Sequence, residues 1–293
     1  MLSQVFNIVA PLFLIISVGY FYGARVRPEM RITNQLVMDV FMPALIFHVM
    51  VQDSFMPSQY VWLVIAGCAL MLGSGVVAYL FAKLFGYHAR SMMPPAMFSN
   101  WANLGLPLYI FALGPVALDG GIMLVVAGNV LCFTVGTYIY SGRFSGLSML
   151  KTPIIAAVIL GGLCNSLSLT MPPFLDTPLE MMGQVAIPMM LFSLGVRLTR
   201  VSFKDAKIGL IMAAFCPIVG ISLAFALAYI LPLSDLHRGI LILFGALPPA
   251  VINYMLSEQY DCEPDQVASM VVIGNLASVV FLPLALILVL LPT

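Results

Sequence analysis

The stretch SNWANLGLP, residues 99–107, interrupts a long apolar region and decides how that region can fold. Two asparagines, a glycine and a proline fall within eight residues, between the apolar segments MMPPAMF (residues 92–98) and LYIFALG (residues 108–114). A proline removes a backbone donor and disturbs a helix at the carbonyl four residues earlier. Irregular backbone at membrane depth is tolerated only where it is buried in protein or lines a water-filled cavity. The stretch therefore predicts a broken helix whose break has a function.

The composition places most of the chain in lipid. Of its 293 residues, 62% are hydrophobic and 8% are charged, whereas a soluble domain has about 25% charged residues. A membrane-spanning helix needs roughly 20 apolar residues. We therefore predict an all-α integral membrane protein with ten transmembrane helices and short loops. The predicted spans lie near residues 3–24, 34–52, 59–85, 92–113, 119–141, 152–170, 179–198, 206–231, 238–257 and 266–291.

Basic residues gather in alternate loops and predict the orientation of the chain. Eleven of the twelve occur in the first, third, fifth and seventh loops, and the exception is Arg238. They are Arg25, Arg27, Arg31, Lys83, Arg90, Arg143, Lys151, Arg197, Arg200, Lys204 and Lys207. Loops rich in Lys and Arg face the cytoplasm, so both termini are predicted to lie outside.

Proline positions indicate an internal repeat. Pro43 and Pro188 are 145 residues apart, and Pro107 and Pro249 are 142 apart, in the same order in both halves. We predict a first five-helix repeat over residues 1–142 and a second over 143–293. An odd number of spans inverts the second repeat relative to the first. Inverted repeats are typical of secondary transporters, whose sites lie near the midplane where discontinuous helices meet.

The predicted ninth span has its own interruption, GALPPAVINY at residues 245–254. We predict that the broken fourth and ninth helices cross. The side chains of Asn100, Asn103 and Asn253 would then bond either the freed backbone groups or a ligand, and the sequence leaves both possibilities open. The N-terminus of a half-helix has partial positive charge, which favours an anion.

Five motifs occur in an order that resembles the auxin efflux carrier family, in its bacterial form. They are PLFLIISVGY (11–20), PALIFHV (43–49), NWANLGLP (100–107), IPMMLFSLGVRL (187–198) and LPPAVINYMLSEQY (247–260). The resemblance implies the ten-span inverted-repeat fold, with two broken helices that cross at proline, as in the bile acid:sodium symporters. It also implies transport of an organic anion, such as auxin in plants or malonate and malate in bacteria. A homodimer in the bacterial cytoplasmic membrane is implied as well.

The candidate site residues follow from the two interruptions and their neighbours. Substrate-binding candidates are Asn100, Trp101, Asn103, Asn129, Asn253, Tyr254 and Asn275, and helix-break candidates are Gly105, Pro107, Pro248 and Pro249. The alternative for the amides is that they only satisfy freed backbone groups or join helices. Trp101 either stacks on a planar substrate or packs in the core.

Two titratable residues in the second predicted span are candidates for coupling or gating. Asp39 would bind a proton or a cation, or pair with the basic rim at Arg197. His48 would act as a gate or pH sensor, or be packed and hydrogen-bonded. Asp176 and Glu180 are interpreted as solvated helix ends. The five cysteines lack metal-ligand spacing, and we expect neither a metal nor a cofactor.

The leading hypothesis is therefore a carrier that moves a small organic anion by alternating access, with export favoured. An alternative is a proton- or sodium-coupled symporter for uptake, and another is an anion channel or a membrane sensor without transport. An enzyme is not expected because neither HExxH nor GxSxG occurs. We expect lipid and a small anion as partners, and no nucleic acid.

Overall fold

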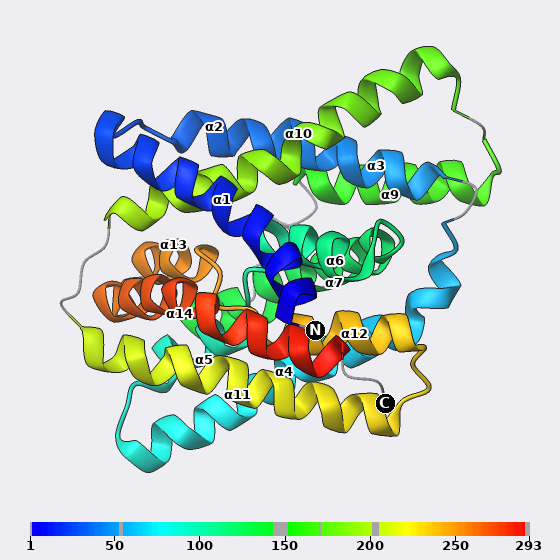
Figure 1. The fold of residues 1–293 in the computed structure, drawn as a ribbon. Coiled ribbons are helices and arrows are strands. Elements are labelled where there is room, and N and C mark those ends of the chain that lie inside the picture. The colour runs from blue at the N-terminus through cyan, green and yellow to red at the C-terminus, as the bar shows by residue number, and fades with distance from the viewer. Residues whose placement is uncertain (1, 53–54, 143–151, 170, 201–204, 291–293) are drawn as a thin grey trace. The chain divides into compact units, whose positions relative to one another are not determined.

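The computed structural model describes residues 2–52, 55–142, 152–169, 171–200 and 205–290, and this part of the chain is mainly helical (Figure 1). Arg143, Lys151 and Lys204, three of the basic residues that predict the orientation, lie outside the described residues. Residue 143, where the second repeat is predicted to begin, lies outside them too. The prediction of an all-α membrane protein is confirmed for the part of the chain described.

Seven helical stretches are long and apolar enough to cross a membrane, and each overlaps a different predicted span. They are Ser3–Val26, Arg31–Val51, Pro57–Phe85, Ala117–Ser141, Pro173–Arg197, Ala206–Ile230 and Pro264–Leu290. The predicted spans near 92–113, 152–170 and 238–257 contain shorter helices instead. Two of these three are the spans with the predicted interruptions.

The chain divides into two compact units. Unit 1 comprises Met1–Pro11, Trp62–Ser145 and Arg200–Thr293, and unit 2 comprises Leu12–Val61 and Gly146–Thr199. Each unit thus combines segments from both halves of the sequence. The predicted inverted repeat stays a prediction.

Unit 2 is built from the greater part of α1 (Leu2–Val26) and from two further groups of helices, one from each half of the sequence. These are α2 (Arg31–Leu36), η1 (Val37–Phe41), α3 (Met42–Val51), η2 (Pro57–Tyr60), α9 (Pro153–Ser166), α10 (Pro173–Arg197) and η6 (Leu198–Arg200). Helix α3 packs against both α9 and α10 (Figure 1). Helices α1 and α10 approach closely at two glycines. A Cβ on Gly19 would collide with the backbone of Phe192, and one on Gly195 with the backbone of Ile16.

Unit 1 contains α4 (Val61–Phe85) and all segments of the two interrupted spans. Its other elements are α5 (Ala89–Met97), η3 (Trp101–Gly105), α6 (Leu106–Leu113), α7 (Ala117–Leu131), η4 (Cys132–Gly136), α8 (Thr137–Ser141), α11 (Ala206–Ile230), α12 (Asp235–Gly245), α13 (Ile252–Gln259) and α14 (Pro264–Leu290).

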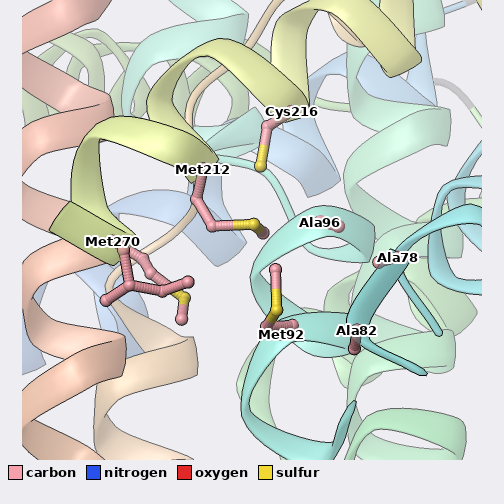
Figure 2. Close-up of a cluster of buried hydrophobic side chains, with 8 residues drawn as sticks. Ala78, Ala82, Met92, Ala96, Met212, Cys216 and Met270 are labelled. Atoms are coloured by element: carbon pink, nitrogen blue, oxygen red, sulfur yellow. The ribbon is translucent and has the colours of Figure 1, made fainter. Parts of the chain in front are cut away.

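A core of small residues and sulfur-containing side chains joins α4, α5, α11 and α14 (Figure 2). Ala78 and Ala82 of α4 and Ala96 of α5 are its small members, and Met92, Met212 and Met270 fill the space around them. All three methionines are fully buried, as expected of flexible side chains that fill irregular gaps. This packing supports α5, the helix that ends at the first interruption.

Prolines explain two wide π-helical turns. Pro43 and Pro107 have no N–H for the carbonyls of Asp39 and Asn103, four residues earlier, and these carbonyls lie within η1 and η3. A proline ring also clashes with that carbonyl. A π-turn widens the helix locally, and such turns are frequent at functional sites. Asp39 and Asn103 therefore lie on irregular backbone for the same physical reason.

We expect Gly195→Ala to destabilise the protein, because the added methyl group forces α1 and α10 apart. Overpacking of this kind costs about 1–3 kcal/mol. The measurement is the thermal midpoint of purified protein in one detergent. Gly162→Ala in α9 is the matched control, since its Cβ would meet only the Cε atom of Met50 at 3.7 Å. Equal midpoints for the two variants would contradict the close-packing argument.

Candidate functional site

The two interruptions meet within unit 1 as a short antiparallel pair of extended segments. Ser99 bridges Pro249. The amide of Asn100 donates to the carbonyl oxygen of Pro248 at 2.7 Å, and the amide of Ala250 donates to that of Phe98 at 2.9 Å. A residue before a proline is pushed toward extended backbone. The Pro248–Pro249 pair therefore favours the extended conformation in one of the two paired segments. The breaks thereby satisfy part of each other's backbone.

Asn253 and Asn275 complete this pairing with their side chains. The Nδ2 atom of Asn253 donates to the carbonyl oxygens of Phe98 at 2.7 Å and Ala250 at 2.8 Å. The Nδ2 atom of Asn275 on α14 donates to those of Pro249 at 3.0 Å and Val271 at 2.7 Å. Both side chains are buried, with 0% and 5% exposure. Their amide hydrogens therefore hold the broken backbone together.

Asn100 and Tyr140 extend the network. The Nδ2 atom of Asn100 donates to the Oδ1 atom of Asn275 at 3.1 Å, and the hydroxyl of Tyr140 on α8 donates to the backbone carbonyl oxygen of Asn253 at 3.2 Å. Asn100 is 2% exposed. The structure thus brings together Asn100, Asn253 and Asn275, which lie far apart in the sequence.

Trp101 packs between aromatic rings. Its indole lies nearly parallel to the Phe244 ring, at 6.3 Å between centroids and 12°, and edge-on to Phe98 at 6.1 Å and 90°. A Cβ on Gly128 of α7 would meet the indole at 2.9 Å. The side chain is 4% exposed, which is the arrangement that the packing alternative predicts.

The other substrate-binding candidates have partly exposed side chains. Asn103 lies in η3, Asn129 in α7, and Tyr254 in α13, where its hydroxyl donates to Oε1 of Glu258 at 3.0 Å. Of the helix-break candidates, Gly105 lies against Leu247 and the hydroxyl of Tyr109, and Pro107 begins the first turn of α6. In unit 1, Asn103 and Asn129 are therefore the candidate amides most available to a ligand.

The coupling and gating candidates both lie in unit 2. Asp39 is exposed on η1, and it forms no salt bridge with Arg197 within the described part of the chain. His48 is half-buried on α3, and its Nδ1 atom lies 2.8 Å from Oδ1 of Asp176 on α10. Gln52 donates through Nε2 to the other ring nitrogen at 3.3 Å.

Sequence reasoning missed the role of Asp176, which it placed at a solvated helix end. The carboxylate instead joins α10 to α3 through His48. These two residues are 128 positions apart, and both stand near span ends in the sequence. Only their common position near the ends of predicted spans could have suggested that these two residues meet.

The turn between α13 and α14 contains Cys262, whose Sγ atom lies 3.9 Å from Nδ1 of His88. Burial raises the pKa of this thiol, and the positive charge of Arg90 opposes the shift. The raised pKa keeps the thiol protonated at neutral pH, as expected of a structural cysteine. Among the described residues there is no group of three or more His, Cys, Asp or Glu side chains that could hold a metal ion.

We expect Asn275→Ala to destabilise unit 1 because it leaves the buried carbonyl oxygen of Pro249 and the Asn100 side chain without their partner. A buried polar group that loses its partner costs about 1–3 kcal/mol. Thermal unfolding of purified protein provides the measurement. Asn129→Ala, which removes a partly exposed amide from the same unit, should change the midpoint much less. A larger effect of the control would be inconsistent with this network.

Comparison with known proteins identifies the family of the chain. The sequence matches the family model for membrane transport proteins over residues 4–143 and 137–286. A protein of Methanocaldococcus jannaschii described as an uncharacterized transporter is 24% identical over 300 aligned positions, which cover 95% of this chain and 96% of that protein. The chain belongs to the membrane transport protein family, the family of auxin efflux carriers that the sequence motifs indicated.

Proposed function

We propose that this transporter moves a small organic anion through the membrane by alternating access, with the paired breaks of unit 1 as its binding site. The observation that carries the proposal is the antiparallel pairing at Ser99 and Pro249. It places the starts of η3 and α13 beside a cluster of neutral amides. The dipole of a helix start favours a negative ligand.

The proposed fold has ten spans in two inverted repeats, residues 1–142 and 143–293, with the broken fourth and ninth helices crossing. Seven apolar stretches of spanning length and two interrupted spans support it. The proposed orientation places both termini outside the cytoplasmic membrane, and the proposed assembly is the homodimer implied by the family.

Unit 1 is the part that we propose to move with the substrate. All backbone and side-chain bonds of the paired breaks lie within this unit, so it can move against unit 2 without breaking them. Asn103 and Asn129 then contact the anion, while Asn100, Asn253 and Asn275 hold the backbone that surrounds it.

Export of a monoanion needs no coupling ion in this proposal. An inside-negative potential favours outward movement of one negative charge by about 2.3 kcal/mol per 100 mV. Uptake would need a coupled ion, and Asp39 is the available carboxylate for that alternative. A channel would differ from a carrier because a channel shows no saturable counterflow.

We expect Asn103→Ala to abolish the stabilisation of the protein by its anion, because the variant removes a polar contact from the site. A ligand at 100 times its Kd stabilises the folded state by about 2.7 kcal/mol. The measurement is thermal unfolding with malonate, malate, lactate, oxalate and indole-3-acetate. Asn165→Ala in unit 2 is the control and should respond like the parent. If no anion stabilises the parent, or if Asn103→Ala responds equally, the proposed site is wrong.

We expect Asp39→Asn to leave anion counterflow in vesicles unchanged at pH 6 and pH 8, because export requires no proton on this carboxylate. The parent at both pH values is the reference, and Asn103→Ala is the variant that should fail. A pH dependence in the parent that disappears in Asp39→Asn would instead favour the proton-coupled symporter.

A further inference from the structure

The Oδ1 atom of Asn253, a buried oxygen at the paired breaks, accepts no hydrogen bond from the described residues. Its side chain is 0% exposed. Most buried polar side-chain atoms in folded proteins have a partner, and an exception calls for a specific reason such as a missing water, an ion or a function. The atom lies in the first turn of α13, at the centre of the proposed binding site.

The orientation of this amide is fixed by its surroundings. Nδ2 donates to two backbone carbonyl oxygens, those of Phe98 at 2.7 Å and Ala250 at 2.8 Å. A carbonyl oxygen only accepts hydrogen bonds, so a half-turn of the amide would set Oδ1 against two acceptors. Oδ1 must therefore point away from both, as an acceptor.

The other polar groups of Asn253 are already engaged. Its backbone N–H donates to the carbonyl oxygen of Ala250 at 3.1 Å, and its backbone oxygen accepts from the hydroxyl of Tyr140 at 3.2 Å. Oδ1 is therefore the one position on this residue that is open to a new hydrogen bond. Ile252 and Tyr254, on either side of it in the chain, are partly exposed.

We propose that Oδ1 of Asn253 accepts a hydrogen bond from a hydroxyl or N–H group of the transported anion. The inference rests on the proposed function and narrows its substrate class. The substrate is then a carboxylate that also carries a hydrogen-bond donor, such as a hydroxy acid or an acid with a ring N–H. The carboxylate lies toward Asn103 in η3, and the donor toward Asn253 in the first turn of α13.

This arrangement makes the site selective against anions of the same charge that lack the donor. A site built to bond a hydroxyl or N–H rejects an analogue without it, because a buried acceptor is then left unpaired. Size and charge alone would not separate such analogues. The site therefore recognises the substrate by its hydrogen-bond donor.

The test compares matched anions on the full-length protein in detergent. The pairs are malate and succinate, lactate and propionate, and indole-3-acetate and naphthalene-1-acetate, each at the same pH and ionic strength. Affinities come from thermal shifts at several concentrations, in sodium and in choline buffer. In at least one pair we expect the donor-bearing member to bind roughly tenfold more tightly or better, with no need for sodium.

Variants then assign the preference to Asn253. In Asn253→Ala the ratio of the two affinities should fall to about one, mainly through weaker binding of the donor-bearing anion. A purely structural role would weaken both members equally and leave the ratio unchanged. Asn165→Ala should keep the full preference. If Asn253→Ala does not fold, equal binding within all three pairs of the parent would still overturn the inference.

The outcomes separate this inference from the proposed function. Equal binding within every pair, still abolished by Asn103→Ala, would keep the anion site and overturn the inference, with an internal water at Oδ1. Binding that requires sodium and ignores the donor would assign Oδ1 to a cation and also overturn it. Failure of all six anions to bind would overturn both proposals.

Discussion

The antiparallel pairing of residues 98–100 with residues 248–250 is the constraint on which unit 1 depends. Hydrocarbon offers no partner to a free backbone group, so a break in a membrane helix is tolerated only where other protein groups or water satisfy it. Here each break supplies donors and acceptors to the other, through the amides of Asn100 and Ala250. The carbonyls that remain are reached by Asn253 and Asn275. Neither interrupted span would be stable without the other, and this ties two segments about 150 residues apart into one structure.

The same pairing divides the asparagines into those whose amide groups already bond to protein acceptors and those whose amide groups remain available to a ligand. Asn100, Asn253 and Asn275 are buried, and their amide hydrogens are committed to protein acceptors. Asn103 and Asn129 are partly exposed. An amide that holds backbone is as necessary to a binding site as one that touches the ligand, because a ligand is recognised well only by groups that are fixed before it arrives. Mutations of Asn100 and Asn275 should mainly change folding and those of Asn103 and Asn129 affinity, whereas Asn253 combines both roles under our proposal.

The sequence was sufficient to locate both breaks, and it was not sufficient to assign their bonds. Proline and glycine have local consequences, so Pro107 and the Pro248–Pro249 pair could be interpreted from their neighbours alone. The acceptors of an asparagine depend on residues that folding brings near, as Phe98 and Asn253 show at a separation of 155 positions. The contact of His48 with Asp176 could not be predicted for the same reason, because folding brings together two residues that are distant in the sequence. Trp101 could stack on a substrate or on Phe244, and only the packing of α12 distinguishes these possibilities. Hydropathy averages over a window, so it predicted spans through the two breaks where the structure has short helices.

Neutral amides at the breaks have an energetic consequence for a carrier. A fixed charge in the middle of the membrane is costly when its site is empty, and a carrier must return empty or exchange its load. In the proposed site, amides and half-helix ends would attract an anion with partial charges and no fixed charge, so the empty site would leave no unpaired ion in the membrane. Binding can then be strong enough for selection and weak enough for release. The unpaired Oδ1 atom of Asn253 is the exception, because under our proposal its desolvation is compensated when a donor group of the anion binds it. Under our proposal this oxygen contributes to selection, because the site is more stable with a donor-bearing anion bound than with that oxygen unpaired.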